Sequence, residues 1–238
     1  MIQSNSIMRK AFIQNIKFLI TALCFSVAVT SCSKWDDFKK YTASGEITYT
    51  GKMDSVTIFG GKNRVRVLGK LKGDPNIAKV KIYWNDNADS ISFDIPSSGS
   101  VRVFDQIFPV DEGTKNFTIY TIDKAGSKSV AVFVAGTSYG INYRKKISNR
   151  LINNIAVVNS PLKTTINWEP MDLSTGAQYT EVLYTVNAEE RVEISPVTTE
   201  KTDLIGFRST ATSKFKYRTI FKPAPTAIDT FAVAFVER

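Results

Sequence analysis

The sequence has 238 residues and a formal net charge of +9, with 31 Lys and Arg against 22 Asp and Glu. It contains no histidine, which excludes Ser-His-Asp and Cys-His nucleophile systems, histidine-ligated zinc and histidine pH switches. Its two cysteines, Cys24 and Cys32, lie near the N-terminus, so a chain processed at Cys32 must be stable without disulfide bonds.

The N-terminal segment has the three parts of a secretion signal. Met8-Arg9-Lys10 is basic, residues 18–29 are predominantly apolar, and Thr30-Ser31 places small residues before Cys32. The apolar run is shorter than the roughly 20 residues that span a bilayer as a helix. We predict a signal peptide over residues 1–31, with translation starting at Met1 or Met8. Its removal lowers the net charge from +9 to +6, because three basic residues and no acids are lost.

The cysteine that follows Val29-Thr30-Ser31 resembles the lipobox cysteine of bacterial lipoproteins. The resemblance implies that the Cys32 thiol is acylated and that residues 32–43 tether the protein to a membrane. The acidic pair Asp36-Asp37 is similar to the surface-export signal of Bacteroidota lipoproteins, and the same residues also fit a solvated spacer. We therefore expect a lipid-anchored protein of the outer membrane, at the cell surface rather than on the periplasmic face.

Residues 44–137 alternate between apolar and polar positions and are interrupted by Gly, Pro, Asn and Asp, which is typical of an all-β domain. The alternation turns Trp84 and Trp168 toward their cores. The predicted strands of this first domain are 45–50, 64–72, 78–84, 90–95, 101–110, 116–122 and 129–134. Seven short strands at this spacing favour an antiparallel sandwich.

The segment from Glu112 to Ser129 resembles the F-strand region of a fibronectin type III domain. The matching positions are Gly113-Thr114, Phe117, Ile119, Thr121, Asp123 and Ala125-Gly126. The family usually has Tyr where Phe117 stands, so this chain lacks the hydroxyl of that corner. The resemblance implies two tandem antiparallel β-sandwich domains of the fibronectin type III or immunoglobulin-like kind, over residues 44–137 and 138–238.

The second domain begins with a segment that favours a short helix, because Tyr143, Ile147 and Leu151 recur at helical spacing. The β pattern returns from Thr164. Residues 165–170 resemble the second strand of a fibronectin type III domain, whose Trp lies in the core. Further strands are predicted over residues 179–186, 191–197, 214–222 and 229–236.

The stretch from Phe215 to Phe231 is the most distinctive of the second domain. Together with Tyr143, Asn149-Arg150 and Glu181-Val182-x-Tyr184, it resembles a Bacteroidota lipoprotein family of unknown function. Phe215, Tyr217, Thr219 and Phe221 share one strand face, and Pro223 and Pro225 end the strand because they donate no ladder hydrogen bond. We favour a structural hairpin here over a binding loop.

The sequence offers no convergent catalytic or metal-binding group. The adjacent acids Asp111-Glu112 and Glu189-Glu190 would point to opposite strand faces or into solvent. Retaining glycosidases need two carboxyl groups about 5 Å apart across a cleft. Asn85-x-Asn87-x-Asp89 resembles the start of a calcium loop, but the later Gly and Glu of that loop are absent. We expect no catalytic residue, no metal and no cofactor.

The residues expected to face a ligand are basic and aromatic side chains on the outer faces of strands. They are Arg64, Arg66, Lys79, Lys81, Tyr83, Tyr120 and Arg218. The chain has no recognisable nucleic-acid-binding module, so we expect no nucleic acid as partner. The expected partners are the membrane, through the lipid on Cys32, and a surface glycan or an envelope protein.

These observations predict a non-catalytic binding module of the cell envelope, acting in glycan capture or in a nutrient-uptake complex. Two alternatives stay open. The chain can be a structural adaptor or spacer within a surface complex, which an apolar patch would indicate. It can also be a glycoside hydrolase accessory, which a cleft with paired carboxylates would indicate.

Overall fold

The structure is a computed structural model that describes residues 50–72, 74–96 and 101–238. The predicted signal peptide, the acylation site Cys32, the tether and nearly all of the predicted strand 45–50 lie outside these residues. Within the described ranges, no helix is long and apolar enough to cross a membrane. The chain is all-β with several antiparallel sheets, as the sequence predicts.

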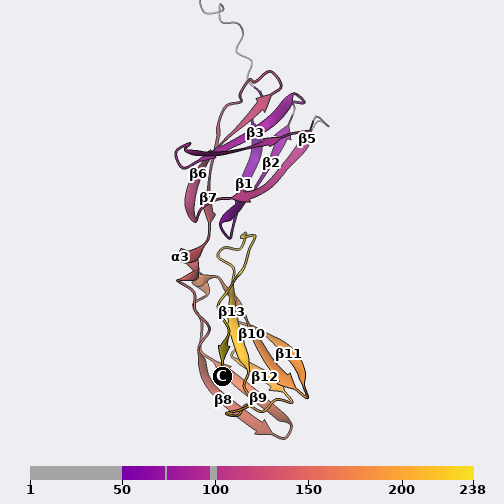
Figure 1. Cartoon of the computed structure of the whole chain (residues 1–238), viewed down its shortest axis with the longest axis vertical. Coiled ribbons are helices and arrows are strands. Elements are labelled where there is room, and N and C mark those ends of the chain that lie inside the picture. Colours follow the sequence, from indigo (N-terminus) through magenta and orange to yellow (C-terminus); the bar gives the residue numbers. More distant parts are fainter. Residues whose placement is uncertain (1–49, 73, 97–100) are drawn as a thin grey trace, which may run out of the picture. The chain divides into compact units, whose positions relative to one another are not determined.

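The first seven strands form two antiparallel sheets (Figure 1). One sheet has the order β1-β2-β5 and the other the order β4-β3-β6-β7. Their bounds are β1 Met53–Gly61, β2 Arg64–Lys72, β3 Ile77–Trp84, β4 Asp89–Asp94, β5 Val101–Pro109, β6 Gly113–Asp123 and β7 Val132–Ser138. A register shift between Asp54 and Thr57 breaks the alternation of β1. The period-2 pattern therefore does not predict this strand.

The core between these two sheets contains apolar residues at alternate positions of β2 and β3, as the predicted period-2 pattern requires. Val65, Val67, Val80 and Ile82 are fully buried. A register shift between Ile77 and Lys79 turns Ile77 inward as well, because an extra residue in one strand changes the phase of the residues before it.

Aromatic rings fill the centre of this core. Phe117, at the position where fibronectin type III domains have Tyr, is completely buried. Its ring centroid lies 6.5 Å from that of Phe108 and 6.2 Å from that of Trp84. The position is thus used for packing and not for a hydrogen bond. Trp84 is half-buried against the same cluster.

The remaining strands form two further sheets. One has the order β11-β10-β13-β14, with β15 also paired to β13, and the other has the order β12-β9-β8. Their bounds are β8 Ile152–Asn159, β9 Leu162–Trp168, β10 Ala177–Val186, β11 Glu189–Pro196, β12 Lys201–Ile205, β13 Lys216–Phe221, β14 Phe231–Ala232 and β15 Val236–Glu237. A 3-10 turn covers Leu173–Thr175.

The core of these later sheets confirms the predicted position of Trp168, which is 5% exposed. Its Nε1 donates a hydrogen bond of 2.7 Å to Thr202 Oγ1, which satisfies the polar atom that a buried indole carries. The predicted common face of Phe215, Tyr217, Thr219 and Phe221 is buried, with Phe215 directly before β13. Ile220, on the opposite face by alternation, is buried as well.

The segment between the two sets of sheets contains one short helix, α3, Ile141–Arg144. Its first turn is capped by Glu112, whose carboxylate accepts hydrogen bonds from the backbone N–H groups of Asn142 (2.7 Å) and Tyr143 (2.8 Å). The helix ends before Ile147, so the predicted helical repeat to Leu151 is wrong. Leu151 is 70% exposed.

The loop after β13 contacts the turn between β1 and β2. The backbone N–H of Ile228 donates to Gly60 O at 2.8 Å. Asp229 accepts from the backbone N–H of Lys62 and from Nε and Nη2 of Arg64, at 2.7, 2.9 and 2.5 Å. Hydrogen bonds from Arg64 are the main reason that the pKa of Asp229 is lowered. Asp229 therefore fastens this loop and does not begin the return strand, which starts at Phe231.

Candidate functional site

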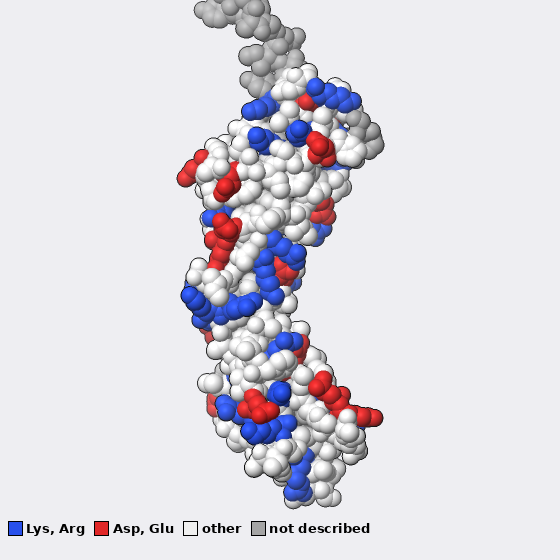
Figure 2. Space-filling model, viewed as in Figure 1, with Lys and Arg blue, Asp and Glu red and all other residues white. Residues whose placement is uncertain are grey.

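The predicted ligand-facing residues are divided among three sheets. Arg64 and Arg66 lie on β2, Lys79, Lys81 and Tyr83 on β3, Tyr120 on β6 and Arg218 on β13. Since β2 and β3 belong to different sheets, their cationic faces form no common patch. In the view of Figure 2, basic side chains are interspersed with acidic ones and do not form one continuous basic surface.

The three predicted arginines are each engaged by a carboxylate. Arg64 pairs with Asp229 at 2.5 Å, Arg66 with Asp105 at 2.6 Å, and Arg218 with Glu181 at 2.5 Å. The hydrogen bond from Arg66 is the main cause that lowers the pKa of Asp105. These arginines are thus tied to strand or loop neighbours and offer less to an incoming anion.

The outer face of the sheet β4-β3-β6-β7 brings the other four predicted residues together. Lys81 and Tyr120 are direct cross-strand partners. Tyr83, two residues along β3, lies on the same face, and its ring meets that of Tyr120 edge to face, with centroids 6.1 Å apart and planes at 87°. Such T-shaped pairs are a favourable aromatic geometry.

Lysines flank both rings of this pair. Lys81 Nζ lies 4.9 Å from the centroid of Tyr83, and Lys128 Nζ lies 5.8 Å from that of Tyr120. Lys79 is next along β3, with its Nζ 3.6 Å from a carboxylate oxygen of Asp94, a side chain that is 90% exposed. We call Lys79, Lys81, Tyr83, Tyr120 and Lys128 the tyrosine–lysine face.

Sequence reasoning missed two contributors to this surface. Lys128 belongs to the loop after β6, where strand alternation gives no direction. Phe133 pairs with Thr118, which itself pairs with Tyr83, and it is 75% exposed. Its phase is hidden because residues 130–134 are all apolar. The exposed Phe133 extends the aromatic surface toward β7.

The other motifs singled out in the sequence have structural roles. Asn85, Asp86 and Asn87 adopt left-handed backbone angles in the turn between β3 and β4, and Asn85 donates to Asp89 at 2.6 Å. Across the described ranges, no group of three or more His, Cys, Asp or Glu side chains is placed to hold a metal ion.

Comparisons with known proteins place the chain in a family. A family model described as DUF4998, domain of unknown function, matches residues 32–231. The chain belongs to this family. A comparison with curated proteins finds no match. The DUF4998 description itself names no activity, ligand or partner.

Three solved structures are similar to the chain at low identity. A two-domain fibronectin type III segment of chicken tenascin has 9% identity and a TM-score of 0.29, covering 79% of this chain and 99% of that one. Domains FN1–FN3 of chicken CNTN1 give 7% identity and a TM-score of 0.39, covering 78% and 68%. The central fibronectin-III array of RIM-binding protein gives 13% identity and a TM-score of 0.27, covering 79% and 62%.

Proposed function

We propose that this DUF4998 protein is a non-catalytic, lipid-anchored binding module of the cell envelope, whose tyrosine–lysine face holds an anionic surface polymer. The observation that carries the proposal is the edge-to-face pair of Tyr83 and Tyr120 with Lys81 and Lys128 over their rings. Aromatic surface combined with a few placed polar groups is what ligand sites use for contact and orientation.

The chemistry of this face favours a polymer with both apolar and anionic parts. The tyrosine rings offer flat apolar contact and hydroxyl groups, which suits the C–H faces of sugars. Lys81 and Lys128 supply point charges that attract sulfate or carboxylate groups without a fixed fork geometry. Because these charges lie on a surface, the attraction is screened over about 8 Å at 0.15 M salt, so the affinity is weak and depends on salt.

Charge-matched variants test this face. The double variant Lys79→Gln/Lys81→Gln is compared with Lys145→Gln/Lys146→Gln, which makes the same charge change at exposed residues after α3. We expect the first variant to bind dextran sulfate about tenfold more weakly at low salt, a loss of roughly 1.4 kcal/mol, and the second to bind as the unchanged chain does. Calorimetry or surface plasmon resonance gives the affinity, with uncharged dextran as the ligand control.

Equal losses in the two double variants would show that only net charge matters, and the face would then have no special role. A Tyr83→Ala variant adds a measurement of the aromatic part, since it leaves all lysines in place. If its affinity for dextran sulfate is unchanged, the tyrosines do not take part in binding.

The lipid anchor rests on the sequence alone, on the short apolar run and the small residues before Cys32. We expect Cys32→Ser to leave an uncleaved precursor or a lipid-free protein, because the thiol is the acyl acceptor. Phase partitioning into detergent and the mass of the mature chain measure this. A variant that partitions as before and has the same modification mass would contradict the anchor.

A further inference from the structure

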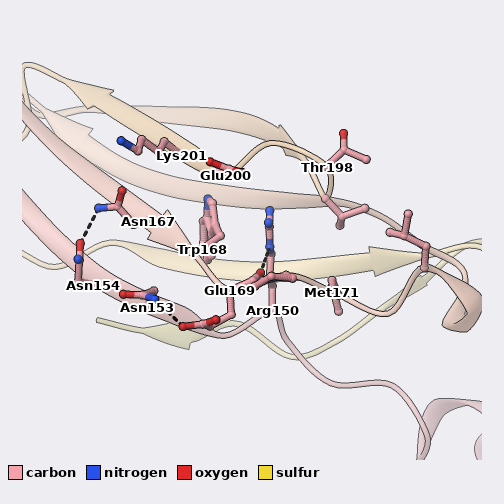
Figure 3. Close-up of a pocket in the computed structure, with 13 residues that line it drawn as sticks. Arg150, Asn153, Asn154, Asn167, Trp168, Glu169, Met171, Thr198, Glu200 and Lys201 are labelled. Atoms are coloured by element: carbon pink, nitrogen blue, oxygen red, sulfur yellow. Dashed lines mark hydrogen bonds between the residues drawn. The ribbon is translucent and has the colours of Figure 1, made fainter.

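A groove of about 620 Å³ lies in the second set of sheets, apart from the tyrosine–lysine face (Figure 3). It is lined by residues at the starts of β8 and β12, at the end of β9 and in the adjoining loops. This volume falls within the roughly 300–1,000 Å³ that small-ligand sites occupy. The side chains that matter for the argument are Arg150, Asn153, Asn154, Asn167, Trp168 and Lys201.

Arg150 is the unusual member of this lining, because it is a buried cation, only 3% exposed. Its Nε donates to the carbonyl of Glu169 at 2.9 Å, and its Nη1 donates to the carbonyls of Thr199 at 2.9 Å and Pro196 at 3.5 Å. All three acceptors are neutral. No carboxylate oxygen of the described residues comes within 4.0 Å of the guanidinium.

A buried charge without a counter-charge is costly, and proteins generally pair such groups. Arg64, Arg66 and Arg218 have carboxylate partners although they are a third or more exposed. Arg150 is buried and has no such partner among the described residues. Burial accordingly lowers the pKa of the Arg150 guanidinium. The backbone carbonyls satisfy its geometry but leave its charge without a partner, which an anion entering the groove would supply.

One nitrogen of the guanidinium is free to meet such an anion. Nη2 of Arg150 makes no hydrogen bond to any described residue. In the described chain, Thr180 Oγ1 is the side-chain polar atom that lacks both a hydrogen-bond partner and contact with solvent. Nη2 also lacks a partner but does not belong to this class, so it keeps some contact with solvent. Figure 3 shows the guanidinium beside the Trp168 ring, and its central carbon lies 5.5 Å from the ring centroid.

Three amide side chains that line the same groove are only partly used in hydrogen bonds. Asn153 Nδ2 donates to Glu169 Oε1 at 2.6 Å, and Asn167 Nδ2 donates to Asn154 Oδ1 at 2.5 Å. Within the described chain, Oδ1 of Asn153 and Asn167 and Nδ2 of Asn154 form no further hydrogen bond. They are two acceptors and one donor available to hydroxyl groups.

The charges around the groove limit the ligand further. The carboxylates of Glu169 and Glu200 also line the groove, although neither forms an ion pair with Arg150 in the described chain. A polyanion would therefore meet two repelling carboxylates, whereas a ligand with one negative group and several hydroxyls would meet suitable partners.

We propose that this groove binds a sugar acid, with its single carboxylate on Arg150 Nη2 and its hydroxyl groups on the side chains of Asn153, Asn154 and Asn167. The site goes beyond the proposed function, because it has its own residues and its own ligand chemistry. Because Nε and Nη1 are held by carbonyls, the carboxylate would accept charge-assisted hydrogen bonds from the N–H groups of Nη2. The surrounding amides give the preference for a hydroxylated ligand over a simple carboxylate.

Calorimetry on the full chain tests the ligand class with three probes, sodium glucuronate, glucose and sodium acetate. We expect glucuronate to bind, and glucose and acetate to bind at least tenfold more weakly. Glucose binding as tightly as glucuronate would overturn the role of Arg150. Acetate binding as tightly as glucuronate would overturn the assignment to a sugar acid, and so would the absence of any glucuronate binding.

Variants locate the binding. Arg150→Lys keeps the charge but removes the Nη2 donor group, and we expect at least a tenfold loss of glucuronate affinity. Arg150 also donates to three backbone carbonyls, so Arg150→Lys can fail to fold. The variant Lys201→Glu therefore tests the groove independently. Lys201 is exposed, so its replacement leaves the core intact while it adds a negative charge to the lining.

The control for Lys201→Glu is Lys145→Glu, which makes the same charge change at an exposed residue away from the groove. We expect a severalfold loss of glucuronate affinity for Lys201→Glu alone. Equal affinities in the two variants would overturn the proposal. Glucuronate binding that persists in Lys79→Gln/Lys81→Gln separates this site from the tyrosine–lysine face.

Discussion

Trp168→Ala should lower the free energy of unfolding by about 3–5 kcal/mol, the range typical of large buried aromatic residues. Trp168 is 5% exposed, and its ring meets that of Tyr217 edge to face at 5.4 Å. The substitution removes this packing, leaves Thr202 Oγ1 without its donor and takes away the ring beside the Arg150 guanidinium. All three effects act in the same direction.

Urea unfolding followed by circular dichroism measures this loss, with Leu151→Ala as the control. The backbone oxygen of Leu151 accepts from the N–H of Glu169, the neighbour of Trp168, at 2.9 Å. Leu151 is 70% exposed, so its truncation should change the free energy by no more than about 0.5 kcal/mol. If Trp168→Ala is as stable as the control, Trp168 is not a core residue. A simultaneous loss of ligand binding would then assign it to a binding platform.

Gly60→Ala should destabilise the first set of sheets by about 3 kcal/mol, at the upper end of the usual cost of overpacking. A Cβ atom on Gly60 would lie 2.0 Å from the backbone oxygen of Thr137 and 2.8 Å from the ring of Tyr139. A backbone oxygen inside a strand cannot move away as a flexible side chain can. The strand β1, which contains Gly60, must therefore shift away from Thr137 in β7.

Gly51→Ala is the matched control for this variant. Its Cβ would approach the Asp74 Cβ at 3.2 Å and meet nothing closer, so a shift of a few tenths of an ångström at Asp74 relieves it. Thermal unfolding of both variants gives the comparison. A melting temperature for Gly60→Ala equal to that of Gly51→Ala would show that β1 and β7 do not approach as closely as the structure has them.

Most of the fold follows from period-2 alternation, and the misses have identifiable causes. The alternation correctly turns Val65, Val67 and Ile82 inward, because one face of each strand packs on a core. It fails in β1, where the register shift between Asp54 and Thr57 breaks the phase. It also fails at Ile220, which is buried although it lies on the outward face of β13.

The residues of the candidate sites can also be predicted only in part from the sequence. Outward phase on β3 and β6 predicts Lys81, Tyr83 and Tyr120, but it cannot show that β3 and β6 are neighbours in one sheet. That pairing depends on long-range contacts with no local signal. The ion pair of Arg64 with Asp229 spans 165 residues, and for the same reason the sequence could not show that this arginine is engaged.

Nothing in the sequence around Arg150 indicates that this side chain is buried, because an arginine beside an asparagine is as common on a surface. Its environment comes from three separate segments, at Glu169, Pro196 and Thr199. A sequence pattern cannot show that a cation lacks a counter-charge. This depends on whether any carboxylate lies near the guanidinium in the folded chain.

The proposed non-catalytic binding function is tested most directly by measuring how the full chain binds a panel of neutral and anionic glycans. Binding is measured at low salt and at 0.15 M salt, and the solution is analysed for released sugars. We expect anionic polymers to be retained at low salt and to bind markedly more weakly at 0.15 M, where screening acts over about 8 Å. We expect no released sugar under either condition. Released sugar would contradict the non-catalytic function, and tight binding to a neutral glycan that is indifferent to salt would contradict the role of the tyrosine–lysine face.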